Sequence, residues 1–214
     1  FMLHKIYCLN LDFNKYFKNY DFHNLYKELL NFCTVDLSAF YFDIRKDTLY
    51  CDPKNSEKRK STLIILNIIL DTLIRWFAPI LSFTTEEIYQ LVFKKNKSIH
   101  LENFLKFPEN FKNDELNQKW LELIKIRNKC NVSIEEKRAS KEIGSSLEAE
   151  LKIKIDNKFK DIFKDIDFSE LCITSKAEIT YDNTVELEVI TKKMQGKKCP
   201  ICWKISSEAC VRHP

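Results

Sequence analysis

The chain contains only two glycines, Gly144 and Gly196, and five prolines among its 214 residues. Glycine and proline are the residues that most often interrupt regular structure, so a chain this poor in both has few points at which it can turn. The scarcity therefore favours long helices. It also excludes the glycine-rich loops that hold nucleotide phosphates, because neither GxGxxG nor GxxxxGK occurs.

Residues from about 1 to 140 show the three- and four-residue spacing of apolar side chains that is typical of a helical bundle. Asp52-Pro53 ends the second predicted helix, and Pro79 closes the third. A further helix is expected from about residue 114 to residue 141. The third helix is expected to carry one apolar stripe, which consists of Leu63, Leu66, Ile69, Leu70, Leu73, Trp76, Phe77 and Ile80.

The period of the pattern changes at Gly144. Apolar residues from Leu147 to Ile155 then alternate with glutamate and lysine, which predicts a half-buried strand. A short helix at about 156–164 should follow, and then strands or a hairpin at 171–174 and 177–181. Val185, Leu187 and Val189 alternate with glutamates and predict one more strand. The fold class is therefore mainly α, with a small α/β domain after the bundle.

The end of the chain carries two ligand-like pairs, a CxxC pair followed by a CxxH pair. Three thiolates and one imidazole at this spacing can hold a tetrahedral structural zinc ion. Two alternatives remain, namely free thiols or a redox-active Cys199–Cys202 pair. The predicted metal ligands are Cys199, Cys202, Cys210 and His213.

The same tail is basic, with six Lys or Arg residues and one acid between residues 191 and 214, although the whole chain has a net charge of only +4. An acidic partner such as nucleic acid fits this charge, whereas the alternative is a solvated, disordered tail. Trp203 directly follows the second cysteine. Its ring either packs the knuckle or stacks on a base.

No constellation for catalysis is visible in the sequence. HExxH and GxSxG motifs are absent, and Asp43 and Asp47, with Arg45 and Lys46 between them, are expected to be solvated. The apolar stretch at 63–81 is interrupted by polar residues, so neither a membrane span nor a signal peptide is expected. The other five cysteines are scattered among apolar residues, as expected for reduced thiols in the cytoplasm.

Four stretches carry a specific resemblance to bacterial-type isoleucyl-tRNA synthetases, which are class I aminoacyl-tRNA synthetases. They are NFCTVDLSAFYFDIRKDTLYCD at 31–52, RWFAPILSFTTEEI at 75–88, KEIGSSLEAE at 141–150 and KKCPICWK at 197–204. The order of these stretches along the chain also fits that family. Valine and leucine enzymes share the bundle and are an alternative, but the three stretches FYFDIRKD, IGSSLEA and CxxCW together favour the isoleucine enzyme.

The resemblance implies an anticodon-binding bundle at 1–105, a connecting helical region at 106–143, a small α/β domain at 144–191 and a zinc-binding tail at 192–214. It implies that the chain holds isoleucine-accepting tRNA and works with the rest of the synthetase chain, as a cytoplasmic monomer. ATP would be used by the catalytic part, whose HIGH and KMSKS signatures are absent here, as is the editing domain. The chain alone is therefore expected to be inactive.

Residues for contact with tRNA follow from the same resemblance. Trp203 is the candidate for base stacking, and the candidates for phosphate contact are Lys197, Lys198, Lys204, Arg212, Arg127, Arg138 and Lys141. The tail departs from the family pattern, in which a second cysteine pair follows a longer loop. The Cys210 and His213 pair still provides a tetrahedral donor set, but the short loop leaves less surface for RNA.

Two further hypotheses come from other classes of protein. One is a free-standing zinc-knuckle protein that binds RNA or acts as a scaffold. The other is a thiol oxidoreductase, which would need the CxxC pair at the start of a helix in a complete βαβ core. A chain that begins at Phe1 and stops at Pro214, directly after the knuckle, favours a fragment of a larger enzyme over both.

Overall fold

The computed structural model describes residues 1–93, 97–183, 186–210 and 212–213. The chain forms two compact units, each built from two separate stretches of sequence. The first unit combines Phe1–Phe40 with Pro53–Asp114, and the second combines Tyr41–Asp52 with Glu115–Pro214. Within the described residues, the helices are too short or too polar to cross a membrane.

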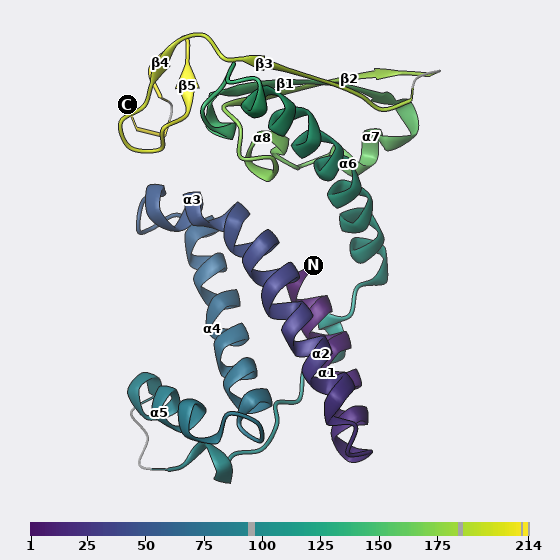
Figure 1. The fold of residues 1–214 in the computed structure, drawn as a ribbon, viewed down its shortest axis with the longest axis vertical. Coiled ribbons are helices and arrows are strands. Elements are labelled where there is room, and N and C mark those ends of the chain that lie inside the picture. Colours follow the sequence, from purple (N-terminus) through teal and green to yellow (C-terminus); the bar gives the residue numbers. More distant parts are fainter. Residues whose placement is uncertain (94–96, 184–185, 211, 214) are drawn as a thin grey trace. The chain divides into compact units, whose positions relative to one another are not determined.

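The first unit is helical, as the apolar spacing predicts. α1 and α2 are joined by three residues and pack against each other, and α1 also packs against α4 (Figure 1). The π-helical run η1 continues α2 and ends in the second unit. The elements are α1 (Met2–Lys18), α2 (Phe22–Asn31), η1 (Phe32–Phe42), α4 (Glu57–Phe77), α5 (Ser82–Phe93), η2 (Ile99–Leu101) and η3 (Glu109–Phe111).

Aromatic rings form the centre of this unit. The Phe13 and Trp76 rings stack with centroids 5.4 Å apart, and Phe104 meets Phe13 edge-on at 4.9 Å. The Trp76 indole is 1% exposed, and its Nε1–H donates to Oδ1 of Asn10 at 3.3 Å. The Asn10 amide in turn donates to the carbonyl oxygen of Leu105. A buried polar bridge therefore crosses the aromatic core.

Only some residues of the predicted apolar stripe lie on the buried face of α4. Ile69 and Trp76 are buried, but Leu63 is 45% exposed, and Ile80, which lies beyond the end of the helix, is 36% exposed. Arg75 is buried in their place, at 8% exposure. Spacing alone therefore does not decide which side chains of α4 are buried.

Arg75 can be buried because all of its charge is compensated. It forms ion pairs with Asp71 at 2.9 Å and with Glu102 at 3.4 Å, and it donates to the carbonyl oxygen of Asn103 at 2.7 Å. A buried guanidinium is tolerated where acceptors bind its N–H groups and carboxylates balance its charge. These partners come partly from a loop 27 residues away, so helical periodicity could not reveal them.

The second unit contains a three-stranded sheet with the strand order β2-β1-β3, in which β1 is parallel to β2 and antiparallel to β3. A separate two-stranded ribbon forms near the end of the chain. The elements are α3 (Asp43–Cys51), α6 (Asp114–Ala139), η4 (Ser146–Glu148), β1 (Ala149–Asp156), η5 (Asn157–Phe159), α7 (Lys160–Phe163), α8 (Phe168–Leu171), β2 (Lys176–Asp182), β3 (Glu188–Lys193), β4 (Lys197–Lys198) and β5 (Ile205–Ser206).

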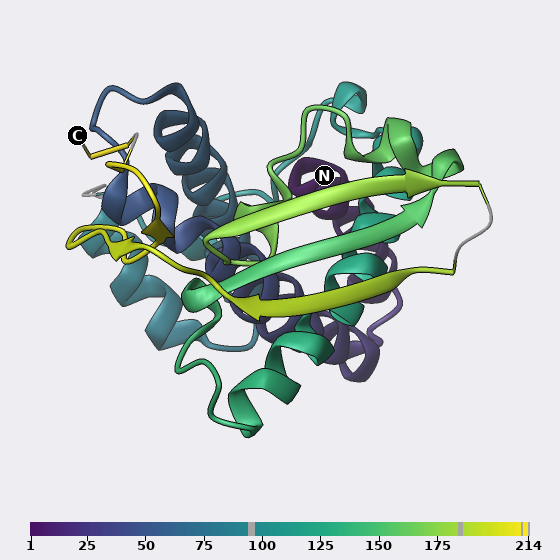
Figure 2. The same cartoon turned by 90° about the horizontal axis from the view of Figure 1, so that it is seen from above.

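The central strand β1 confirms the alternation seen in the sequence. Ala149, Leu151, Ile153 and Ile155 are each at most 1% exposed. The helices α6, α7 and α8 lie on one face of the sheet (Figure 1), and Figure 2 views the sheet from the other side. Between buried positions, β1 presents charged residues that pair across strands, for example Lys154 with Asp182 at 3.0 Å. A sheet with one buried and one solvated face requires this pattern.

The prediction for the strands after β1 is partly wrong. Residues 177–181 do lie in β2, but Leu171 ends the helix α8, and residues 172–174 form no strand. Asp167 starts α8 by accepting from the backbone N–H groups of Ser169 and Glu170. Leu187 lies just before β3, and Val189 lies within it. Val185 lies outside the described residues.

Candidate metal centre

The four predicted ligands come together at the end of the second unit. Cys199 follows β4, and a tight turn leads through Cys202 to β5, with Trp203 N–H donating to the carbonyl oxygen of Cys199 at 3.0 Å. Gly196 permits this close ribbon, since it has a φ of +139° and an added Cβ would lie 2.2 Å from the Ser206 carbonyl oxygen. Cys210 and His213 then return to the turn.

The distances between the donor atoms fit a tetrahedral ion. Nδ1 of His213 lies 3.6 Å from Sγ of Cys199 and 3.5 Å from Sγ of Cys210, and the sulfur atoms of Cys202 and Cys210 are 3.7 Å apart. All four donor atoms lie within 4.8 Å of one another. Zn–S bonds of about 2.3 Å and Zn–N bonds of about 2.0 Å give tetrahedral edges of about 3.8 Å for S···S and about 3.5 Å for S···N.

The backbone fixes the orientation of the His213 ring. Its Nε2 lies 2.9 Å from the carbonyl oxygen of Cys51. A carbonyl oxygen only accepts hydrogen bonds, so Nε2 must carry the proton, and Nδ1 in the neutral ring has a free lone pair. Histidine ligands of metals are commonly held in this way, with the second nitrogen donating to a carbonyl group.

The backbone also prepares one of the sulfur donors. The N–H groups of Cys202 and Ile201 donate to Sγ of Cys199 and lower the pKa of that thiol to about 6. Burial has the opposite effect on Cys202 and raises the pKa of its thiol to about 11. A bound cation stabilises thiolates, so it would favour the deprotonated form of Cys202, which burial disfavours. The residues present therefore fit zinc.

The lysines of β4 and Trp203 lie on the exposed side of this module. Lys197 and Lys198 are both exposed, and Trp203 is 59% exposed. The ammonium group of Lys198 lies 5.6 Å from the centroid of the Trp203 ring. Lys204 is half-buried and donates to the hydroxyl oxygen of Ser169 at 3.4 Å. A cation beside an exposed indole ring suits a nucleotide, because the base can stack on the ring and the phosphate can pair with the ammonium group.

Two of the arginines that were predicted to contact phosphate already bind other residues of this chain. Arg127 is 8% exposed, and it donates to the Leu171 carbonyl oxygen at 2.8 Å and to Asp43 at 3.1 Å. Its guanidinium is thus not accessible to a phosphate. Arg212 forms ion pairs with Asp47 and Asp52. The expectation that Asp43 and Asp47 are solvated is wrong for the same reason, because each accepts from an arginine of the second unit.

The remaining two predicted contacts are exposed and lie away from the ligand cluster in sequence. Arg138 pairs with Glu135 one turn earlier in α6, at 2.7 Å. Lys141 follows α6 and has a left-handed backbone with φ of 60°. Both line a shallow pocket of about 450 Å³ that also includes Glu135 and Gly144.

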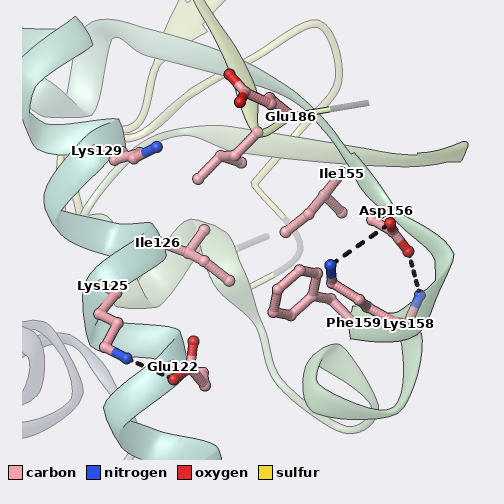
Figure 3. A pocket seen from close by; sticks show the side chains of 10 residues that line it. Glu122, Lys125, Ile126, Lys129, Ile155, Asp156, Lys158, Phe159 and Glu186 are labelled. Atoms are coloured by element: carbon pink, nitrogen blue, oxygen red, sulfur yellow. Dashed lines mark hydrogen bonds and ion pairs between the residues drawn. The ribbon is translucent and has the colours of Figure 1, made fainter. Parts of the chain in front are cut away.

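A second pocket, of about 610 Å³, lies between α6 and the C-terminal end of β1 (Figure 3). Apolar side chains of Ile126, Ile155 and Phe159 line it together with charged groups. Some of these charges are paired locally, as between Lys125 and Glu122 at 2.6 Å. None of its described lining residues is among the residues predicted to bind a metal or tRNA.

The acceptors that surround the ligand cluster were not predicted from the sequence. Cys51, Asp47 and Asp52 lie about 160 residues before Arg212 and His213, the groups that they bind. An aspartate in a charged helix has no local feature that distinguishes a paired carboxylate from a solvated one. The one available signal was the position of Asp52 directly before a proline, where a helix must end.

Comparison with known proteins identifies the class. The sequence of residues 1–155 matches the protein-family model described as the anticodon-binding domain of tRNA ligase. The chain therefore belongs to the family of anticodon-binding domains of tRNA ligases.

Beyond that domain, nearly the whole chain is similar to a part of isoleucine–tRNA ligases. It is 63% identical over 213 residues to the isoleucine–tRNA ligase of Pelagibacter ubique, a match that covers 100% of this chain and 24% of the relative. It is 36% identical to the enzymes of Bartonella henselae and Agrobacterium fabrum, with 97% of this chain and 22% of each relative covered. The chain spans about a quarter of the length of these relatives.

Proposed function

We propose that this chain is the C-terminal, anticodon-binding part of an isoleucine–tRNA ligase, an enzyme that uses ATP to attach isoleucine to its tRNA. The observation that carries the proposal is the 63% identity over the entire chain to such a ligase. Similarity of this extent and order along the chain does not favour a free-standing knuckle protein. Activation of isoleucine with ATP would take place in the remaining three quarters of the enzyme.

In this proposal the helical first unit and the second unit divide the work of holding tRNA. The four predicted segments, at 1–105, 106–143, 144–191 and 192–214, would serve as bundle, connection, small α/β domain and tail. Lys197, Lys198 and Trp203 form an exposed basic and aromatic surface that suits an unpaired nucleotide. Arg138 and Lys141 remain candidates for phosphate contact.

The proposed metal is one structural zinc ion held by Cys199, Cys202, Cys210 and His213. The donor set and its spacing support zinc, and the set uses all four positions of a tetrahedron. The ion would fix the turn that presents Lys198 and Trp203. We further propose that the enzyme acts as a cytoplasmic monomer, which is compatible with eight cysteines that are all free thiols.

Binding of tRNA by the chain tests the proposed function. We expect an isoleucine-accepting tRNA transcript to bind more tightly than the same transcript with a replaced anticodon loop, when both are titrated at one salt concentration. Equal affinity for the two transcripts would contradict anticodon recognition. Zinc is tested separately by metal analysis, where we expect about one ion per chain that a chelator releases.

A further inference from the structure

The helix α3 and the residue after it lie against the cysteine–histidine cluster within the second unit. Arg212, the neighbour of the ligand His213, extends its guanidinium to two carboxylates. Nε donates to Oδ1 of Asp52 at 2.9 Å, Nη2 donates to the same oxygen, and Nη1 donates to Asp47. His213 itself donates to the carbonyl oxygen of Cys51. Two successive residues of the tail are thus fixed to one helix end.

The carboxylates suit this role because they are themselves shielded. The side chain of Asp52 is 11% exposed and that of Asp47 is 19% exposed, against 31% for Arg212. Shielded, charge-assisted hydrogen bonds are stronger than ion pairs at the surface. A guanidinium with a planar fork can bridge two carboxylates, which the ammonium group of a lysine cannot do with the same geometry.

α3 provides a firm base, since other helices of the same unit hold it. Arg127 of α6 binds Asp43 at its first turn, at 3.1 Å. Glu170 of α8 accepts from Arg45 at 3.0 Å and from Thr48 at 3.3 Å. The helix is therefore tied along its length to α6 and α8 before its end meets the tail.

We infer that Asp47 and Asp52 are positioning residues of the metal centre, which act through Arg212 to hold the imidazole of His213 at the ligand position. The metal centre is then not an independent knuckle but includes the end of α3. The inference rests on the proposed zinc site. Arg212 then belongs to the metal centre, whereas the sequence predicts a tRNA contact for it.

His213 needs such support more than Cys199 and Cys202 do. Cys199 and Cys202 belong to one turn that a backbone hydrogen bond closes, between Cys199 N–H and the Lys204 carbonyl oxygen at 2.9 Å. His213 is the last described residue of the chain and follows β5 by seven residues. Without an anchor, that segment would lose more conformational entropy when the metal binds.

The test replaces both carboxylates with isosteric amides, as Asp47→Asn with Asp52→Asn, in the 214-residue chain. Zn²⁺ affinity is measured by competition with a chromogenic chelator, and ligand identity is measured from the d–d spectrum of bound Co²⁺. We expect zinc to bind about 10- to 100-fold more weakly, as is typical when support of a metal ligand is lost. We also expect the Co²⁺ spectrum to change from a three-sulfur, one-nitrogen site towards one with water in place of His213.

Glu135→Gln is the matched control, since it removes a carboxylate from an exposed ion pair with Arg138 and should leave both measurements unchanged. If the unmodified chain binds neither Zn²⁺ nor Co²⁺, the proposed metal site itself fails. If the chain binds both but the double variant matches it in affinity, the positioning role is overturned. Weaker binding with an unchanged Co²⁺ spectrum also overturns it, because the carboxylates would then act through charge and not through His213.

Discussion

Nε2 of His213 lies 2.9 Å from the carbonyl oxygen of Cys51, and this contact determines which ring nitrogen is available to a metal. Because Cys51 O accepts the Nε2 proton, Nδ1 points its lone pair towards the sulfur atoms of Cys199 and Cys210. The ligand set is therefore prepared by the protein backbone. Removing one ligand should be far more damaging than changing a cysteine elsewhere.

Replacing Cys199 with serine is expected to release zinc and to unfold the tail while the helical unit stays folded. The hydroxyl of serine is a poor zinc ligand, and metal binding supplies much of the folding free energy of small metal modules. Metal analysis and limited proteolysis of the tail measure the two effects. Cys33→Ser, at a half-buried thiol of η1, is the control and should retain zinc. Full zinc content in the Cys199 variant would exclude this residue as a ligand.

Replacing Asn10 with alanine is expected to destabilise the first unit by about 1–3 kcal/mol, since it leaves buried polar groups without partners. Asn10 accepts from the Trp76 indole and donates to the Leu105 carbonyl oxygen, both at 3.3 Å. Urea unfolding followed by tryptophan fluorescence measures the change. Asn128→Ala, at an exposed position of α6, should stay within about 0.5 kcal/mol of the unmodified chain. Equal stability of the two variants would show that the bridge contributes nothing.

Local patterns predicted the parts of the structure that depend on neighbours in sequence. The alternation of Leu151, Ile153 and their neighbours identified β1, and two closely spaced ligand pairs identified the cluster around Cys199. Scarce glycine correctly indicated a mainly helical chain. In each of these cases the residues that interact are separated by a few positions, so their spacing alone contains the information.

Long-range pairing set the limits of prediction from the sequence. Arg75 is buried on α4 only because Glu102 and Asp71 neutralise it, and Leu63 is exposed although it fits the apolar stripe. Likewise, the partners of Arg212 lie about 160 residues earlier. Such contacts depend on the tertiary fold, so the sequence could suggest a basic residue at this position but not its acceptor.

The carboxyl of Glu86 gives the first unit a stability that depends on pH. It accepts from Gln90 and Ser98 at 2.8 Å and from the backbone N–H of Ile99 at 2.9 Å. The Gln90 amide, followed by the Ser98 hydroxyl, holds the pKa of this carboxyl below its usual 4.5. A lowered pKa in the folded state means that the contribution is complete above the unfolded value and is lost as the pH falls through the folded value.

Glu86→Gln should therefore be less stable than the unmodified chain at pH 7, and the difference should shrink as the pH falls below about 4.5. Urea unfolding at a series of pH values measures it. Glu87→Gln, at the exposed neighbouring position, is the control and should follow the unmodified chain. A stability difference that stays constant with pH would mean that the Glu86 carboxyl is not the titrating group.

Replacing Lys197 and Lys198 with alanine should weaken tRNA binding and reduce the slope of log affinity against log salt by about 1–2, since each phosphate contact releases counterions. The control removes two lysines from the outer face of the sheet. Lys152 and Lys154 are paired there with Glu178 and Asp182, at 3.8 and 3.0 Å. An unchanged slope for the first variant, or the same reduction in both, would remove β4 from the tRNA contact surface.

The role of Trp203 can be separated into packing and stacking by measuring two affinities in one variant. The ring is 59% exposed, and Lys198 lies beside it with 5.6 Å between the ammonium nitrogen and the ring centroid. Trp203→Ala should weaken tRNA binding by about 1–3 kcal/mol, the range found for loss of one stacked base. Zinc affinity should stay unchanged, since more than half of the Trp203 side chain is exposed. Trp203→Phe should recover part of the tRNA affinity because it restores an aromatic face. If the alanine variant loses zinc affinity and tRNA affinity by the same factor, the ring packs the knuckle and does not contact RNA.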